Sequence, residues 1–254
     1  MKLVTWNVNS IRARLDRLVD FLRTRQPDVI CLQETKVEDD AFPVLELHAL
    51  GYQIIFHGQR TYNGVAILSK RPIKDVVRGF SDGGDEAQSR FLSASVDGLR
   101  LHNVYVPNGQ APGTDKYHYK LEFMARLDRW LRAHAGDGPA ILLGDFNVAP
   151  ADLDVHDPVA WHEQIMCSTV ERAALARIVE AGWTDTLRKL HPQLSVFTWW
   201  DYRQLSFPKG KGLRIDHIFA TAPVAARVRE VKVDREARKG KQPSDHAPVI
   251  ADLD

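Results

Sequence analysis

Residues 140–147 read AILLGDFN, an apolar run that ends abruptly in a glycine, an acid and an amide. Similar short runs recur at 2–8, 28–34, 52–58, 64–70, 101–107, 214–221 and 246–253. Apolar runs of this length, bounded by turn-forming residues, are typical of buried strands. The sequence therefore predicts a fold rich in β-sheet, in which several strands end in a polar side chain.

Three stretches at 14–24, 115–134 and 168–182 instead repeat apolar residues with helical spacing. Ser10 precedes the first, and Ser168 with Glu171 forms an S-x-x-E capping box at the start of the third. The third closes at Gly182, as helices commonly do. Strands mixed with helices predict a layered α/β fold.

The sheets of this fold are expected to be mixed or antiparallel. The run at 64–70 leads directly into Lys70-Arg71-Pro72, which predicts a hairpin and turn rather than a strict strand–helix–strand repeat. The chain has 254 residues and no repeat or linker-like tract, so we expect one domain spanning 1–254. Two sheets packed together with helices outside would suit this number of strands.

Composition excludes several classes of protein. With 44% hydrophobic and 26% charged residues, the chain resembles an ordinary globular protein. No apolar run approaches the roughly 20 residues of a membrane helix, and the start lacks the apolar stretch of about 7–15 residues in a secretory signal. Two cysteines, Cys31 and Cys167, are too few for a disulfide framework. We expect a cytoplasmic or nucleoid-associated protein with reduced thiols and no membrane partner.

The net charge of +1 does not indicate a nucleic-acid partner, but basic residues are clustered. The clusters are Arg12, Arg14 and Arg17, then Lys209, Lys211 and Arg214, and the segment 227–241. Such clusters can bind phosphates, although an isolated cluster is more often ordinary solvent-exposed surface.

Polar residues at the ends of the apolar runs are the most informative feature. Strand ends meet at one edge of a sheet, so these residues are expected to converge on a rigid support. The set comprises four carboxylates, two amides and one imidazole: Asn7, Glu34, Asp145, Asn147, Asp216, Asp245 and His246. Carboxylates so close together would repel one another unless a cation lay among them. Oxygen ligands without thiolates favour Mg²⁺ or Mn²⁺ over Zn²⁺, which points to cleavage of a phosphate ester.

Each member of this set has a simpler interpretation when taken alone. Asp145 and Asn147 could begin a turn, Asp245 could cap a strand, and a single His246 is commonly structural. Asp216 lies inside an apolar run and is the hardest to explain structurally, because a buried carboxylate without a partner is costly. The conjunction of all of them favours a site.

The ordered motifs WNVNSIRAR, PDVICLQETK, NVYVPNG, GDFNVAP, FTWWDYR, GLRIDHIFA and PSDHAPV resemble the exonuclease III family of AP endonucleases. This family is part of the endonuclease/exonuclease/phosphatase superfamily, and the resemblance covers the whole chain. It implies a DNase I-like, four-layer α/β sandwich of two mixed sheets packed face to face and flanked by helices. The segment 156–167 departs most visibly from the family pattern.

The resemblance also implies roles for matching residues. Glu34 would be the principal metal ligand, with Asn7 and Asp245 nearby. Asp145 would position or deprotonate the attacking water with the help of Asn147. These two residues and His246 also count among the possible metal-site residues.

Other matching residues would act on the substrate. His246, paired with Asp216, would stabilise charge on the phosphoryl oxygens. Tyr105 and Asn108 would line the phosphate. Contacts to the DNA are implied for Arg90, and a small apolar pocket for an abasic sugar is implied for Trp199, Leu213 and Ile215.

The function implied is Mg²⁺-dependent incision 5′ to abasic sites in duplex DNA, with 3′→5′ exonuclease activity and removal of blocked 3′ ends. Mn²⁺ is the expected substitute ion, and a monomer is the expected state. Two alternatives remain open: a phosphatase acting on a small phosphate ester, and a DNA-binding homologue with weak catalysis.

Overall fold

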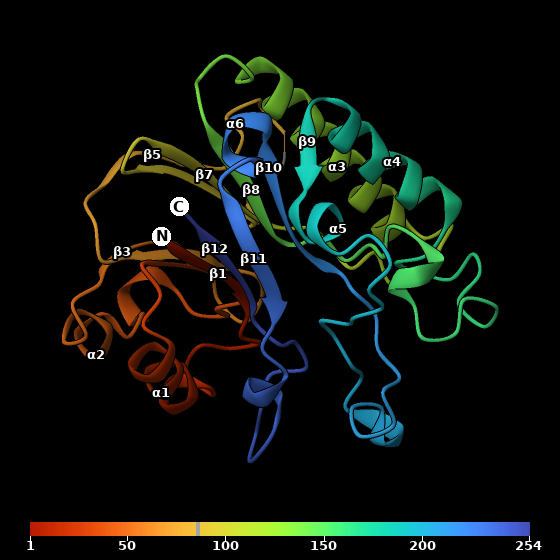
Figure 1. Cartoon of the computed structure of the whole chain (residues 1–254), viewed down its shortest axis with the longest axis horizontal. Coiled ribbons are helices and arrows are strands. Elements are labelled where there is room, and N and C mark those ends of the chain that lie inside the picture. Colours follow the sequence, from red (N-terminus) through yellow and green to blue (C-terminus); the bar gives the residue numbers. More distant parts are fainter. Residues whose placement is uncertain (85–86) are drawn as a thin grey trace.

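The computed structural model describes residues 1–84 and 87–254, and it contains two six-stranded sheets packed face to face (Figure 1). Sheet A has the order β11-β12-β1-β2-β4-β3, and sheet B has the order β5-β6-β7-β8-β10-β9. The strands are β1 (Lys2–Asn7), β2 (Val29–Gln33), β3 (Gln53–His57), β4 (Val65–Ser69), β5 (Ile73–Arg78), β6 (Phe91–Val96), β7 (Leu99–Tyr105), β8 (Ala140–Asp145), β9 (Trp183–Asp185), β10 (Asp216–Thr221), β11 (Val228–Val233) and β12 (Val249–Leu253).

Helices cover the outer faces of both sheets, which completes the predicted four layers (Figure 1). The α-helices are α1 (Leu15–Arg25), α2 (Val44–His48), α3 (Asp115–Ala133), α4 (Thr169–Glu180), α5 (Thr186–Leu190) and α6 (Ala222–Ala225). Short 3₁₀ turns are η1 (Asp39–Ala41), η2 (Asp152–Asp154), η3 (Arg203–Leu205) and η4 (Arg235–Arg238). Among the described residues, no helix combines the length and apolar character that crossing a membrane requires.

Alternation along each strand assigns its side chains to two different cores. In β2, Ile30 and Leu32 pack with α1, whereas Val29 and Cys31 pack in the core between the sheets. Both faces of such a strand are buried, so its sequence is continuously apolar. Both sheets are mixed, because β1 and β2 are parallel, as are β7 and β8, while neighbouring pairs are antiparallel.

The two sheets are also joined by a buried amide network directly below the strand ends. Gln33 donates to the side-chain oxygens of Asn103 at 2.8 Å and Thr5 at 2.9 Å. Asn103, on the opposite sheet, donates to the carbonyl oxygens of Leu32 at 3.0 Å and Ala66 at 2.9 Å. Polar groups buried this deeply need their partners, so the network fixes how one sheet lies on the other.

The structure confirms the three long helices and the eight predicted strands, with some differences in detail. Residues 64–70 do form half of a hairpin, but the partner is the preceding strand β3, and β5 joins the other sheet. The first helix starts at Leu15, one residue after the predicted start, and Ser10 accepts from the Ala13 amide in the turn before it. The capping box of Ser168 and Glu171 is present.

Four strands, β5, β6, β9 and β11, lie outside the predicted runs. Strand β6 is almost wholly buried, yet Ser93 and Ser95 interrupt its apolar pattern. Strand β11 lies within the basic segment 227–241, where it pairs with β12 at the edge of sheet A. Burial makes β6 a strand, whereas β5, β9 and β11 are edge strands that form by pairing with a neighbouring strand.

Gly144 is required at the end of β8, where it pairs with Val104 of the parallel strand β7. Its φ is +145°, and a Cβ there would lie 1.9 Å from the Val104 carbonyl oxygen. The neighbouring backbone cannot give way to that atom, since it belongs to the ladder that carries Asp145.

We therefore expect Gly144→Ala to reduce the free energy of unfolding by roughly 2–5 kcal/mol, through backbone strain and overlap. Urea denaturation of both proteins measures the difference. Gly136→Ala is the matched control, because a Cβ at Gly136 meets nothing within 4 Å. Equal unfolding midpoints for the two variants would contradict this account of Gly144.

Candidate active site

The ends of five strands, β1, β2, β7, β8 and β10, deliver the central side chains to one rim of the paired sheets. Asn7 closes β1 and pairs with Gln33, the residue before Glu34. Asp145 closes β8, where it pairs with Tyr105 on one side and with Asp216 on the other. The ladders place these residues side by side, as the sequence predicted.

Ligand atoms from Glu34, Asp145 and His246 all lie within 4.8 Å of one another, a grouping that could hold a metal ion. The Asn7 amide bridges the two acids, since its Nδ2 donates to Glu34 Oε1 and to Asp145 Oδ2, both at 2.9 Å. Asn7 and Asp145 have no exposed surface. Hard oxygen donors of this kind are suited to a divalent cation such as Mg²⁺.

Glu34 is held in a backbone conformation that side-chain-bearing residues rarely adopt, with φ +51°. Its Oε2 pairs with the Lys36 ammonium at 2.7 Å. Burial alone would raise the pKa of Glu34, but Lys36 and the Asn7 amide outweigh it and hold that pKa below its ordinary value. Glu34 is therefore ionised and available to a cation at neutral pH.

His246 and Asp216 form the expected pair, with His246 Nδ1 2.9 Å from Asp216 Oδ2 and Nε2 3.7 Å from Asp145 Oδ2. Burial lowers the pKa of His246, but the Asp216 and Asp145 carboxylates outweigh burial and raise it to about 10. The imidazole is thus a cation and a hydrogen-bond donor at neutral pH.

Burial has the opposite consequence for Asp145. It raises the pKa of this carboxyl to about 7, and His246 only partly opposes the increase. Asp145 is therefore the one acid of the cluster poised to take up or release a proton near neutrality, the property that a general base requires. A cation in the cluster would favour its ionised form.

Asn147 and Asn108 lie beside Asp145 on two neighbouring loops. The Asn147 backbone amide donates to Asp145 Oδ1 at 2.9 Å, and its side-chain amide donates to the Val106 carbonyl at 2.9 Å. Asn108 Nδ2 reaches Asn147 Oδ1 at 3.3 Å. The φ of Asn147 is +50°, a value that Asn tolerates better than most residues.

Tyr105 is buried next to Glu34, with which it makes a hydrogen bond. Burial, followed by the charge of Glu34, raises its pKa well above the ordinary value, so the phenol is neutral and acts as a donor. The Arg90 guanidinium lies over the Tyr105 ring at 4.7 Å, and Arg90 Nε donates to Gln88 at 2.7 Å. The structure thus brings Arg90 to the site through Tyr105.

Asp245 lies next to His246 in the chain, but its carboxylate has other partners. Asp245 Oδ1 accepts from Asn9 Nδ2 at 2.9 Å, and Oδ2 accepts from the Trp199 indole at 3.0 Å. It is not among the three grouped ligand residues. In this arrangement Asp245 connects the rim to Trp199.

The three expected pocket residues come together in one apolar cluster. Trp199 and Leu213 form an isolated antiparallel β-bridge. Both residues pack with Ile215 in an apolar cluster that Ile165 also contacts. Leu213 and Ile215 have no exposed surface. Trp161 meets the Trp199 ring edge-on at 6.5 Å. A sugar could reach Leu213 or Ile215 only if part of this cluster moved.

Two further residues of the site, Asn9 and Lys36, were not assigned roles from sequence. Lys36 Nζ donates to Asn9 Oδ1 at 2.6 Å, which links the Glu34 side of the site to Asp245. Both residues lie within the motif stretches WNVN and QETK, so their positions in the sequence were the available signal. Their pairing depends on the folded loops, which sequence spacing does not reveal.

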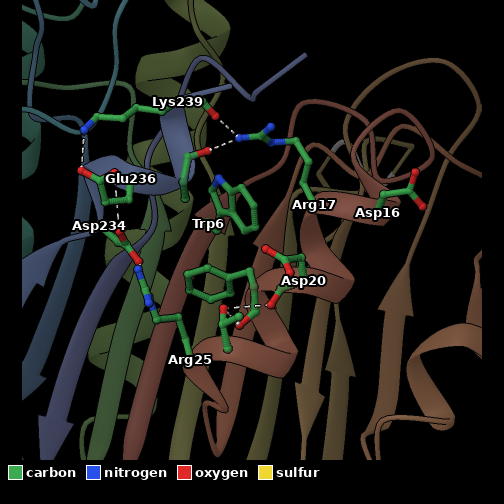
Figure 2. A pocket seen from close by; sticks show the side chains of 11 residues that line it. Trp6, Asp16, Arg17, Asp20, Arg25, Asp234, Glu236 and Lys239 are labelled. Atoms are coloured by element: carbon green, nitrogen blue, oxygen red, sulfur yellow. Dashed lines mark hydrogen bonds and ion pairs between the residues drawn. The ribbon is translucent and has the colours of Figure 1, made fainter. Parts of the chain in front are cut away.

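Part of the predicted basic surface is used to hold the chain together. A cavity of about 500 Å³ lies between α1 and the segment 234–239. Figure 2 shows the side chains that line it. There Arg17 donates to the carbonyl oxygens of Ala237 at 2.9 Å and Lys239, and Arg25 pairs with Asp234 at 2.6 Å. The indole of Trp6, at the floor of the cavity, donates to the His246 carbonyl at 3.2 Å. Arg17 therefore supports the segment leading to His246.

Arg214, from a second predicted basic cluster, is also internal. It is 1% exposed and pairs with Asp154 at 2.6 Å and Asp185 at 2.8 Å. These two ion pairs anchor the backbone of residues 213–215. The guanidinium of Arg214 therefore has no exposed surface that could bind a phosphate.

We expect Asp216→Asn to lower the pKa of His246 markedly from about 10, because the largest attraction for its positive charge is removed. An NMR titration of the imidazole in metal-free protein measures this value. Asp201→Asn is the control, since Asp201 pairs with Arg203 at 2.7 Å instead. An unchanged His246 titration in Asp216→Asn would show that this pair does not set the charge.

Comparisons with known proteins identify the family of this chain. The endonuclease/exonuclease/phosphatase family matches residues 4–246. An exodeoxyribonuclease III of Haemophilus influenzae is 37% identical over 266 residues, covering 100% of both chains. A 3′ phosphatase from Neisseria, solved with a product DNA hairpin, is 44% identical with a TM-score of 0.98, covering 100% of this chain and 99% of that one.

An AP endonuclease from Archaeoglobus fulgidus is 39% identical with a TM-score of 0.96, and the match covers 100% of this chain and 99% of that one. These matches extend over the whole sheet framework and the rim residues described above. The chain belongs to the endonuclease/exonuclease/phosphatase family, and within it to the exonuclease III branch of phosphodiester hydrolases.

Proposed function

We propose that this protein is a Mg²⁺-dependent DNA-repair phosphodiesterase that incises duplex DNA 5′ to abasic sites and processes 3′ ends. The 3′ activities would include 3′→5′ exonuclease action and removal of blocking groups. The observation that carries the proposal is the convergence of Glu34, Asp145 and His246 within 4.8 Å. Relatives named as an exodeoxyribonuclease, a 3′ phosphatase and an AP endonuclease support the substrate class.

The residues present fit a Mg²⁺ ion. Glu34 and Asp145 offer carboxylate oxygens, and the Asn7 amide lies between them. When bound, Mg²⁺ would supply Lewis-acid activation at the phosphate. Mn²⁺ accepts the same oxygen donors and is the expected substitute.

The protein's own groups then divide the remaining work. Asp145, with its pKa of about 7, would accept a proton from the attacking water. The neighbouring amides of Asn147 and Asn108 would help to place that water. The imidazolium of His246 would donate to a phosphoryl oxygen, where negative charge increases in the transition state. The neutral Tyr105 phenol would donate to the phosphate or leaving group.

Access to the apolar cluster bears on which activity dominates. A 3′-terminal phosphate needs only the rim, whereas an abasic sugar seated against Leu213 and Ile215 would have to displace neighbouring side chains. We therefore expect removal of a 3′ phosphate to be faster than incision at an abasic site.

A panel of four substrates tests the proposed function: an abasic duplex, a recessed 3′ end, a 3′-phosphorylated nick and an inositol phosphate, each with Mg²⁺ and with excess chelator. We expect cleavage of the DNA substrates with Mg²⁺ and loss of cleavage with chelator. Turnover of inositol phosphate without DNA cleavage would replace the proposal by a small-molecule phosphatase. Binding of DNA without any turnover would indicate a catalytically weak homologue.

Asp145→Asn should lose most turnover, by roughly 100-fold or more, because the proton acceptor is removed. DNA binding, measured by fluorescence anisotropy, should survive. Asp128→Asn is the control, since Asp128 pairs with Arg132 on the outer helix α3. Full activity in Asp145→Asn would exclude this residue from the reaction.

DNA binding should weaken as salt rises, because basic residues displace counterions from phosphates. A plot of log affinity against log salt measures this slope, and a flat response would argue against contacts to the DNA backbone. We further propose that the protein acts as a monomer in the cytoplasm, near the nucleoid. A light-scattering mass near 28.7 kDa is the expected result.

A further inference from the structure

A buried ion pair lies directly beneath the loops that carry Asn108 and Asn147. Lys120, in the second turn of α3, pairs with Glu171, in the first turn of α4. Both side chains have 0% exposure. The reaction proposed above uses neither of them.

Lys120 is also bound to the site loops. Its Nζ donates to the Asn147 carbonyl at 2.7 Å and to the Asn108 carbonyl at 3.1 Å. An ammonium has three donors, and Glu171 and these two carbonyls account for all three. One buried cation thus holds the two loops whose side-chain amides meet at 3.3 Å.

Glu171 is fixed in turn by its own neighbours. Its Oε1 accepts from the Met166 amide at 3.0 Å, and its Oε2 accepts from Ser168 N at 3.1 Å and Oγ at 2.6 Å. The Ser168 hydroxyl also meets the Tyr117 hydroxyl at 2.7 Å. The carboxylate is therefore a rigid support for Lys120.

Helix capping does not explain the lysine. Glu171 caps α4 through Ser168 whatever residue occupies position 120. A buried ion pair is also a poor source of stability, because an apolar pair of similar volume often serves as well or better. The directed bonds to two loop carbonyls are what an apolar residue could not supply.

We propose that Lys120 is a positioning residue, which fixes the backbone of Asn108 and Asn147 so that their side-chain amides stay in place beside Asp145. This inference rests on the proposed function for the reaction itself. Glu171 contributes by holding the ammonium in place. A displacement of a reacting group by about 1 Å can reduce a rate by roughly 100-fold. Loss of the two Lys120 hydrogen bonds is therefore expected to lower kcat.

The test compares Lys120→Met, Glu171→Gln and the double variant. Glu171→Gln keeps one acceptor oxygen, enough for the Ser168 donors, and its NH2 then faces Lys120 and the Met166 amide. The lysine can still donate to both carbonyls, so the kcat of this variant should lie well above that of Lys120→Met. The double variant contains no buried charge, so it should recover the thermal stability that Lys120→Met loses. Its kcat should nevertheless remain roughly 10- to 100-fold low, because both carbonyls lack their donor.

Two readouts separate positioning from a general loss of structure. Metal affinity should change little in the double variant, because Lys120 makes its hydrogen bonds and ion pair with Asn108, Asn147 and Glu171, and removing the lysine together with the glutamate leaves the net charge beneath the site unchanged. The side-chain amide resonances of Asn108 and Asn147 should shift in both variants that lack the lysine. Arg126→Met is the matched control on the same helix: this buried arginine pairs with Asp82, and its loss should lower stability but not kcat.

Full kcat and unshifted amide resonances in the double variant would overturn the proposal and leave the pair a purely structural feature. If the wild type cleaves no DNA at all, the proposed function fails instead, and the amide resonances alone decide the role of Lys120. If the variants lacking lysine do not fold, a kcat for Glu171→Gln as low as that of an Asn147→Ala variant would overturn it, because Lys120 keeps both carbonyl bonds there. A kcat well above that of Asn147→Ala would support it.

Discussion

The fully buried carboxylate of Asp145 is the constraint on which this site depends. A charge removed from water is costly unless other groups stabilise it. Here the stabilising groups are the Asn7 amide at 2.9 Å, the backbone amide of Asn147 at 2.9 Å and the His246 imidazolium at 3.7 Å. Asn7 and His246 come from distant parts of the chain and from the opposite sheet, so the carboxylate can be accommodated only when both sheets are correctly aligned. The network of Gln33 and Asn103 supplies that alignment directly below.

The surroundings of the two carboxyl groups, Glu34 and Asp145, shift their pKa values in opposite directions. Glu34 has a pKa below its ordinary value because Lys36 and Asn7 outweigh burial, whereas the pKa of Asp145 rises to about 7 because burial outweighs its neighbours. His246 is kept positively charged by Asp216. One rim thus presents an anionic ligand, a proton acceptor near neutrality and a fixed cation. Such differences between neighbouring titratable groups are characteristic of sites that handle protons.

Loops complete the site, and each is held by buried polar contacts. Lys120 grips the carbonyls of Asn108 and Asn147 from below. Arg17 grips the segment 237–241, which leads to His246. Arg214, paired with Asp154, anchors the strand start that carries the apolar cluster. Arginine and lysine residues that could be taken for DNA contacts therefore serve in part as internal supports of the binding surface.

The sequence by itself determined the layered α/β fold, the main strands and helices, and the members of the central cluster, because buried strands leave continuous apolar runs whose polar ends stand out. Only the tertiary structure decided which of these polar residues share one center. Asp245 faces Asn9 and Trp199 although it adjoins His246, and Lys36 reaches Asn9 across a loop. Strand β6 became a strand through burial despite its serines. Side-chain direction, burial and pairing across distant segments are properties of the assembled fold, so they cannot be predicted from a local stretch of sequence.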